Sequence, residues 1–271
     1  MYNLHVKLIS IFFCYIIFST QPTSVKCQPS AKNMVKVPAG KYNFLVDYRW
    51  REGLTLDSLL IDDAGVHYRH SKTVTLPSFL IDKTEVTNEQ FKQFSDDTGY
   101  KPKSLKNFLK HWKNATYPKA KANHPVVWVS IDDANAYAKW AGKRLPTEEE
   151  WQKAAQGDDG RDWPWGNIYD QGKANMDSRD TKPVGSYPKG ASPYGCLDLT
   201  GNVWEWTNSV QTDGYHNFCW IRGGSYYFAK GSRWYMQGGP IANYQRAKFW
   251  LMTPALNRSA SIGFRCVKDI E

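Results

Sequence analysis

The stretch YGCLDLTGNVWEWT, residues 194–207, decides how the rest of the sequence is interpreted. Asp198 and Glu205 supply carboxylate oxygens on the two sides of a turn at Gly201, and main-chain carbonyls between them can complete an oxygen cage of the kind that calcium prefers. Residues 203–207 predict a short strand that leaves this turn. A carboxylate pair that only caps the turn is the alternative, so both a calcium site and a hydrogen-bonded turn stay open.

The sequence beyond residue 157 lacks helical periodicity. It is rich in Gly, Pro, Asn, Asp and aromatic residues, and its strand candidates are short: residues 203–207, 220–222 and 263–267. Long ordered loops need something other than hydrogen-bond ladders to hold them, and metal ions and disulfides are the usual means. We therefore expect a loop-rich C-terminal half that is held by such cross-links.

Two strand regions are predicted near the N-terminus. Residues 34–42 and 44–46 predict extended chain across a turn at Gly40. The alternation in residues 71–81 predicts an edge strand, because Pro77 has no N–H to donate to a central ladder.

Three helices are predicted from their N-caps, which are Thr87, Ser130 and Thr147. Glu150 follows Thr147 at the capping-box position. Residues 100–123, between the first two helices, are rich in Lys and predict an irregular surface insertion.

The composition is that of a globular domain. The 271 residues are 41% hydrophobic and 23% charged, which excludes a disordered chain, a coiled coil and collagen. Aromatic residues make up 15%, which suits a rigid core with few regular elements or a surface that stacks on a ligand. The net charge of +9 comes from Lys and Arg scattered among acids, so we expect no nucleic-acid partner.

The first segment predicts a secretory signal peptide at residues 1–27. A basic start precedes an apolar run at 8–18, which is too short to span a bilayer. A short tether at 28–33 and one domain at 34–271 follow, without a transmembrane span. Cleavage after Cys27 and lipid attachment to it both stay open, with a soluble product favoured. We expect an exported protein, which is periplasmic, at the cell surface or secreted.

Three cysteines remain after the predicted leader: Cys196, Cys219 and Cys266. One disulfide is expected in an oxidising compartment. Cys196 and Cys219 are the favoured pair because they flank one Trp-rich, hairpin-like segment, which leaves Cys266 buried in the core.

Six segments together carry a family resemblance, and they occur in one order over residues 34–268. They are IDKTEVTNEQF (81–91), HPVVWVSIDDANAYAKWAGKRLPTEEEW (124–151), WPWGN (163–167), YGCLDLTGNVWEWT (194–207), RGGSY (222–226) and SIGFRC (261–266). The combination resembles the formylglycine-generating enzyme, or sulfatase-modifying factor, family. The resemblance implies a single C-type-lectin-like α+β domain with little regular secondary structure.

The resemblance also implies calcium sites. The first would use the side chains of Asp198 and Glu205 and the carbonyls of Gly201 and Val203. Asp198 stands where the family usually has Asn, which adds charge and removes no oxygen. The nearest matches to a second family site are Asn175 and Asp180.

The sequence departs from the family at the positions that bind copper. Sulfatase-activating members hold copper(I) with two cysteines, which follow the Tyr of RGGSY by two and seven residues, and soft thiolates suit that ion. Phe228 and Arg233 occupy those positions here. We therefore expect neither a copper cofactor nor formylglycine formation by that route.

The family's substrate groove matches a set of aromatic, polar and cationic residues: Trp204, Ser225, Tyr226, Phe228, Arg233 and Trp234. Such a set suits a protein or glycan ligand, although the aromatic members can equally fill a core. We expect a calcium-stabilised, non-catalytic binding or assembly module. The alternative is an oxidative enzyme of the same superfamily, of the formylglycine-generating or the non-haem iron type, with a non-standard site.

Overall fold

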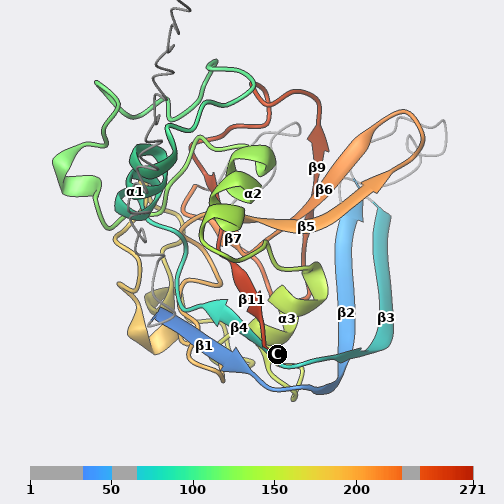
Figure 1. Cartoon of the computed structure of the whole chain (residues 1–271). Coiled ribbons are helices and arrows are strands. Elements are labelled where there is room, and N and C mark those ends of the chain that lie inside the picture. Colours follow the sequence, from blue (N-terminus) through green and yellow to red (C-terminus); the bar gives the residue numbers. More distant parts are fainter. Residues whose placement is uncertain (1–32, 51–65, 228–238, 271) are drawn as a thin grey trace, which may run out of the picture.

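A computed structural model describes residues 33–50, 66–227 and 239–270 (Figure 1). The predicted leader, most of the tether, and Phe228, Arg233 and Trp234 lie outside these ranges. No helix in the described ranges is long and apolar enough to cross a membrane. The elements form a mixed α+β domain with many loops, as expected from the sequence.

The first sheet joins the two ends of the domain. Its order is β1 (Met34–Val37), β4 (Phe79–Asp82), β11 (Val267–Asp269), and both pairings are antiparallel. Ile81 on the central strand is fully buried and lies opposite Val35 and Val267. Because β4 pairs with strands from both ends of the chain, this sheet fixes the N-terminal segment against the C-terminal one.

The second sheet has the strand order β10-β5-β6-β9. Its strands are β10 (Ile262–Gly263), β5 (Trp204–Thr212), β6 (Asn217–Arg222) and β9 (Ala247–Leu251). β10 runs parallel to β5, and the other pairings are antiparallel. The predicted strands at 203–207 and 220–222 are therefore confirmed as parts of β5 and β6.

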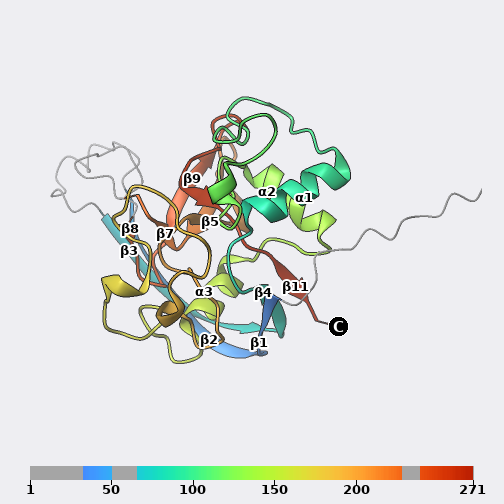
Figure 2. The ribbon, with the colours of Figure 1, turned by 90° about the vertical axis from the view of Figure 1, so that its left-hand side faces the viewer.

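Two further pairs complete the strands. They are β2 (Gly40–Trp50) with β3 (Val66–Leu76), and β7 (Gly224–Ser225) with β8 (Gly239–Pro240). The long β2–β3 ribbon stands at one side of the molecule in Figure 1, and Figure 2 shows the same ribbon from another side. It packs on α3 through β2, whose Tyr42 hydroxyl donates to the carbonyl of Glu149 at 2.6 Å.

Two strand predictions need correction. Residues 71–81 are not one edge strand, because β3 ends at Leu76 and β4 begins at Phe79, with Pro77 in the break. β4 is the central strand of its sheet, so the proline ends one strand instead of marking an edge. Residues 263–267 are likewise divided between β10 and β11, which belong to different sheets.

The three helices begin at their predicted N-caps. They are α1 (Asn88–Thr98), α2 (Ile131–Trp140) and α3 (Glu148–Gln156), and each has a complete capping box. A capping box satisfies two N–H groups of the first turn by local contacts alone. This local origin explains why the helix starts are readable from the sequence.

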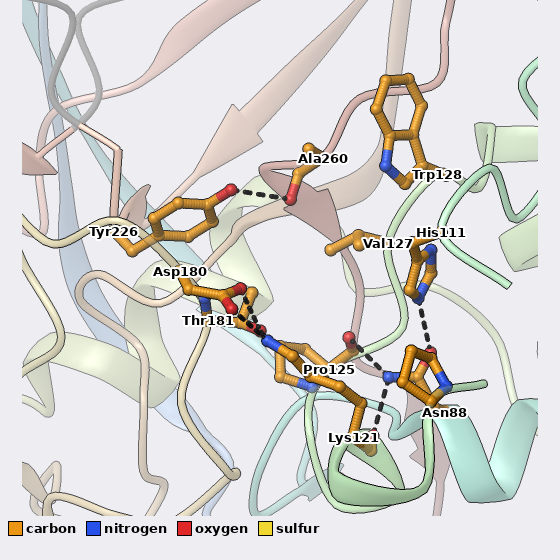
Figure 3. A pocket seen from close by; sticks show the side chains of 11 residues that line it. Asn88, His111, Lys121, Pro125, Val127, Trp128, Asp180, Thr181, Tyr226 and Ala260 are labelled. Atoms are coloured by element: carbon orange, nitrogen blue, oxygen red, sulfur yellow. Dashed lines mark hydrogen bonds and ion pairs between the residues drawn. The ribbon is translucent and has the colours of Figure 1, made fainter.

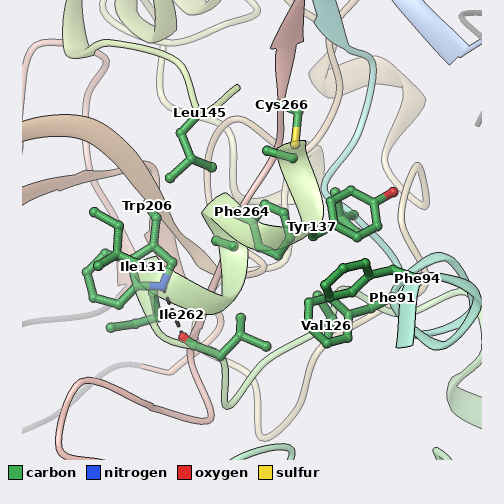
Figure 4. Packing of buried hydrophobic residues seen from close by; sticks show 14 of the residues in the cluster. Phe91, Phe94, Val126, Ile131, Tyr137, Leu145, Trp206, Ile262, Phe264 and Cys266 are labelled. Carbon is green, nitrogen blue, oxygen red and sulfur yellow. Dashed lines mark hydrogen bonds between the residues drawn. The ribbon is translucent and has the colours of Figure 1, made fainter. Parts of the chain in front are cut away.

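The larger hydrophobic core lies between α1, α2 and the second sheet (Figure 4). The ring of Phe91 stacks on Tyr137 with centroids 5.9 Å apart, and the edge of Phe264 meets both rings. The indole of Trp206 donates to the carbonyl of Val129 at 3.1 Å. A smaller core lies between α3 and the first sheet, with Trp151 at its centre.

Residues 100–123 are irregular, as predicted, but they are more than a surface insertion. Leu109 is buried in the larger core, and Phe108 and Trp112 pack against it. The aromatic residues of this segment therefore anchor it, and its lysines are exposed apart from Lys121, which is partly buried.

The predicted disulfide between Cys196 and Cys219 is absent from the structure. Cys196, Cys219 and Cys266 are free and buried, and the favoured partners belong to different cores, Cys196 to the smaller and Cys219 to the larger. Burial raises the pKa of Cys196 to about 11 and that of Cys219 to about 12. These thiols therefore stay protonated at neutral pH and behave as apolar core residues.

Candidate metal site and ligand pocket

The turn at Gly201 is held by close main-chain contacts. Gly201 has a φ of 79°, and a Cβ there would lie 2.4 Å from the carbonyl oxygen of Asn175, so only glycine fits. The N–H of Gly201 donates to the carbonyl of Gly223 at 2.8 Å, and that of Asn202 donates to Asn175 at 2.9 Å. The turn thus joins the loop around residue 175 to the segment that follows β6.

Glu205 is engaged by a buried guanidinium group. Arg265 donates from Nε and Nη2 to the two carboxylate oxygens of Glu205, at 2.7 Å each. The indole Nε1 of Trp151 donates to Oε2 of the same carboxylate at 2.7 Å. Because both oxygens have partners and Arg265 neutralises the charge, Glu205 serves here as an internal counter-ion.

Asp198 lies close to a second acid, Glu85, and the charge of Asp198 acts on the Glu85 carboxyl group. The N–H of Gly185 donates to Asp198 Oδ2 at 2.5 Å, and Asn202 Nδ2 donates to Glu85 Oε1 at 2.9 Å. Glu85 Oε2 is buried and has no partner among the described residues. Burial raises the pKa of both carboxyl groups, and the charge of Asp198 raises that of Glu85 further.

Asp198 and Glu85 fit a hard cation. They are two adjacent buried carboxyl groups with an unpartnered oxygen, and the nearby Arg265 is already paired with Glu205. No group of three or more His, Cys, Asp or Glu side chains in the described part of the chain converges on a metal position. Main-chain oxygens of the turn, such as those of Gly201 and Val203, would therefore have to complete the coordination.

Asn175 and Asp180 do not fit a divalent cation. Asn175 donates from Nδ2 to the main-chain carbonyl of Asp180 at 3.0 Å, and its Oδ1 accepts from Ser178 Oγ at 2.8 Å. The carboxylate of Asp180 forms an ion pair with Lys121. An ammonium group of the chain itself therefore already neutralises the predicted ligand.

The same Lys121–Asp180 pair lines a pocket of about 220 Å³. Tyr226 and Asp180 lie on one side of this pocket, and Val127, Trp128 and His111 lie on the other (Figure 3). The remaining lining residues are Asn88, Pro118, Lys121, Pro125, Thr181 and Ala260. Five separate segments of the sequence thus meet at this pocket.

Trp128 has an unusual backbone in this pocket, with a φ of 61°. A bulky residue rarely adopts this left-handed conformation, which costs on the order of 1–3 kcal/mol. Two main-chain hydrogen bonds stabilise this conformation. The N–H of Trp128 donates to the carbonyl of Ser259 at 2.9 Å, and the carbonyl of Trp128 accepts from the N–H of Leu109 at 3.0 Å. The surrounding fold therefore imposes the position of the half-buried indole.

The predicted groove residues are not all at this pocket. Tyr226 lines it, whereas Trp204 is only 2% exposed and belongs to the larger core. Ser225 is also buried, and its hydroxyl donates to the carbonyl of Tyr227 at 3.3 Å. Three pocket residues were not predicted from the sequence. His111 and Lys121 lie in the segment interpreted as a surface insertion, and Trp128 lies within an apolar run that predicts a buried segment.

The comparison with protein families identifies the domain. The family described as the sulfatase-modifying factor enzyme 1-like domain matches residues 20–270. The chain belongs to this family. It is 33% identical to the formylglycine-generating enzyme of Thermomonospora curvata over 233 residues, which cover 66% of this chain and 72% of that protein. It is 29% identical to the inactive Cα-formylglycine-generating enzyme 2 of Bos taurus, covering 86% of this chain and 87% of the relative.

The chain also matches part of a much longer protein and spans only about a third of its length. The serine/threonine-protein kinase Pkn1 of Chlamydia trachomatis is 33% identical over 228 residues, which are 78% of this chain but only 35% of the kinase. Among solved structures, PvdO from Pseudomonas aeruginosa superposes with a TM-score of 0.61 at 22% identity, covering 88% of this chain and 94% of PvdO. That likeness supports the fold alone.

We expect the loss of the ion pair between Arg265 and Glu205 to lower the stability of the domain strongly. Arg265→Met leaves the carboxylate of Glu205 buried without its counter-charge, so we expect the free energy of unfolding to fall by about 3–5 kcal/mol in urea denaturation. The matched control is Arg161→Met, because Arg161 pairs with Asp159 at the surface. That variant should lose less than about 1 kcal/mol. Equal losses in the two variants would contradict the assignment of Arg265 as the central counter-ion.

Proposed function

We propose that this chain is an exported, non-catalytic binding module of the sulfatase-modifying factor family, stabilised by calcium, with its ligand site at the pocket beside Trp128. One observation supports the proposal that the module is not catalytic. Phe228 and Arg233 occupy the positions that match the family's copper-binding cysteines. The chain therefore lacks the pair of soft ligands on which copper(I) chemistry depends.

The remaining thiols cannot replace that pair. Cys196, Cys219 and Cys266 are all buried, and burial raises the pKa of each one above that of an ordinary thiol. Copper(I) binds the thiolate form, which a raised pKa disfavours. None of the three lines the pocket.

The iron-dependent alternative has weaker support. A non-haem iron site of the common type needs two histidines and a carboxylate on one face. Among the described residues, no such group of three ligands is found. His111 and His124 lie near the pocket, but Asp180, the carboxylate that acts on both imidazoles, is already paired with Lys121. The relative named as inactive also supports a role of this scaffold without catalysis.

Calcium would stabilise the turn from which β5 departs. Asp198 and Glu85 would hold the ion together with main-chain oxygens, while Glu205 would contribute through its charge and remain paired with Arg265. The bound ion would supply positive charge to two buried carboxylates that otherwise must share a proton. Export is supported by the predicted signal peptide at residues 1–27.

The non-catalytic proposal predicts that the mature protein leaves a sulfatase-type cysteine peptide unchanged. Incubation with copper(I) and oxygen should give no formylglycine product by mass spectrometry, since no dithiolate holds the metal. A formylglycine-generating enzyme serves as the positive control in the same reaction. Conversion above the level of a reaction without protein would overturn the proposal, whatever ligand the pocket binds.

The calcium proposal predicts a response to chelation. Removal of calcium should lower the Tm of the wild type, since a ligand that binds only the native state at about 100 times its Kd stabilises it by about 2.7 kcal/mol. Asp198→Ala should abolish the response. Asp180→Asn should keep it, because Asp180 is paired with Lys121 and does not fit the ion. Identical melting of the wild type with and without chelator would disprove calcium binding.

A further inference from the structure

We propose that the pocket beside Trp128 binds one neutral pyranose ring of a glycan, with the apolar face of the sugar on the indole and its hydroxyl groups between His111 and the Lys121–Asp180 pair. This inference rests on the proposed binding function and specifies the class of its ligand. The size, the charge and the hydrogen-bonding groups of the pocket each support it.

The size of the pocket limits the ligand to about one ring. Its volume of about 220 Å³ is below the roughly 300–1,000 Å³ of pockets that hold drug-sized molecules. The wall formed by Pro125, Val127 and Trp128 is apolar, while Lys121 and Asp180 are polar. The ligand must therefore be small and must have both an apolar face and polar edges, as a pyranose does.

The charge of the pocket favours a neutral ligand. The ammonium group of Lys121 is neutralised by its ion pair with Asp180. Burial, together with the charge of Lys121, lowers the pKa of His111 to about 4, so its imidazole is uncharged at neutral pH. An anion would compete with Asp180 for Lys121, and a cation would compete with Lys121 for Asp180. A neutral polyol faces neither competition. The ammonium group of Lys110 lies 5.0 Å from the centroid of the Trp128 ring, so the sugar must stack on the part of the indole that this exposed side chain leaves open, or displace it.

The hydrogen bonds of Asn88 fix the proton of His111. Asn88 Nδ2 donates to the main-chain carbonyls of Lys121 and His124, at 2.9 and 3.2 Å, which orients the amide. Asn88 Oδ1 lies 3.0 Å from His111 Nε2 and 3.0 Å from Trp112 Nε1, so it accepts a hydrogen bond from each when Nε2 carries the imidazole proton. Trp112 Nε1 is also 3.1 Å from Nε2, but donation to an unprotonated Nε2 would leave the Nε2 lone pair facing the Asn88 oxygen. Nδ1 of His111 is consequently an acceptor, and it is buried without a partner among the described residues. A hydroxyl group of a ligand is a suitable donor to it.

The opposite side of the pocket offers the complementary groups. The carboxylate of Asp180 accepts from the N–H of Thr181 at 2.8 Å, and it retains acceptor capacity beside the Lys121 donor. An acceptor and a donor side by side suit two adjacent hydroxyl groups, each of which can both donate and accept. The Tyr226 hydroxyl donates to the carbonyl of Ala260 only at 3.5 Å, so a ligand oxygen can compete for it.

The left-handed backbone at Trp128 allows a variant that removes the indole without disturbing the fold. Because φ at this residue is 61°, Trp128→Gly removes the indole and relieves the backbone at the same time. The variant should therefore fold with a Tm no lower than that of the wild type. Trp128→Asn serves as a second variant, since Asn also tolerates this conformation. Loss of binding without loss of stability would separate a ligand contact from a structural role.

The experiment titrates the calcium-loaded mature protein with the methyl α-pyranosides of glucose, galactose, mannose and N-acetylglucosamine, followed by saturation-transfer NMR and tryptophan fluorescence. We expect at least one glycoside to bind with a millimolar Kd, and Trp128→Gly and Trp128→Asn to weaken it at least tenfold. Trp250→Ala is the matched control, because Trp250 is a partly exposed indole on β9, outside the pocket. It should leave the Kd unchanged.

Three outcomes would overturn the inference: no binding of any glycoside at tens of millimolar, equal binding by the Trp128 variants, or Trp128-dependent binding of a free amino acid or peptide in place of the glycosides. If one of these outcomes is found and the protein also forms no formylglycine, only the proposed glycan ligand is refuted. Conversion of the cysteine peptide would instead refute the proposed function itself.

Discussion

The domain depends on one buried ion pair, that between Arg265 and Glu205. Arg265 lies between β10 and β11, Glu205 lies on β5, and Trp151 of α3 donates to the same carboxylate. The guanidinium also donates to the carbonyls of Leu197 at 2.9 Å and Asp82 at 3.2 Å, so most of its donors are satisfied. A buried pair is tolerated only when it is hydrogen-bonded in this way, because both desolvation costs must be offset. The first sheet, the second sheet and α3 therefore meet at the carboxylate of Glu205.

The arrangement of internal cations explains which acids are free to bind a ligand. Arg265 neutralises Glu205, and Lys121 neutralises Asp180. Glu85 and Asp198 lie next to each other, and no side chain in the described ranges forms a salt bridge with either, which makes them the candidate calcium ligands. The Lys121–Asp180 pair has a second consequence, since it makes the pocket beside Trp128 polar without giving it a net charge.

The sequence predicted those features that local contacts determine. Thr87, Ser130 and Thr147 begin their helices because a capping box involves only four consecutive residues. The six family motifs led to the correct fold class for a related reason, since their order carries the long-range information that single segments lack. The family match over residues 20–270 confirms that identification.

Features that arise from distant contacts could not be predicted in this way. β11 has three residues and is a strand only because it pairs with β4, which lies almost 190 positions earlier. Cys196 and Cys219 flank one segment in the sequence, yet the fold places them in separate cores. Glu85 joins Asp198 from a different motif, and the conformation of Trp128 follows from its bonds to Ser259 and Leu109. Such relations need the three-dimensional structure.

We propose that this chain keeps the sulfatase-modifying factor scaffold around calcium, without oxidative metal chemistry. Metal analysis of the purified mature protein by inductively coupled plasma mass spectrometry is the direct test. We expect calcium bound in stoichiometric amount, with copper and iron present only in traces. Stoichiometric copper or iron, or a folded protein that holds no calcium, would contradict it.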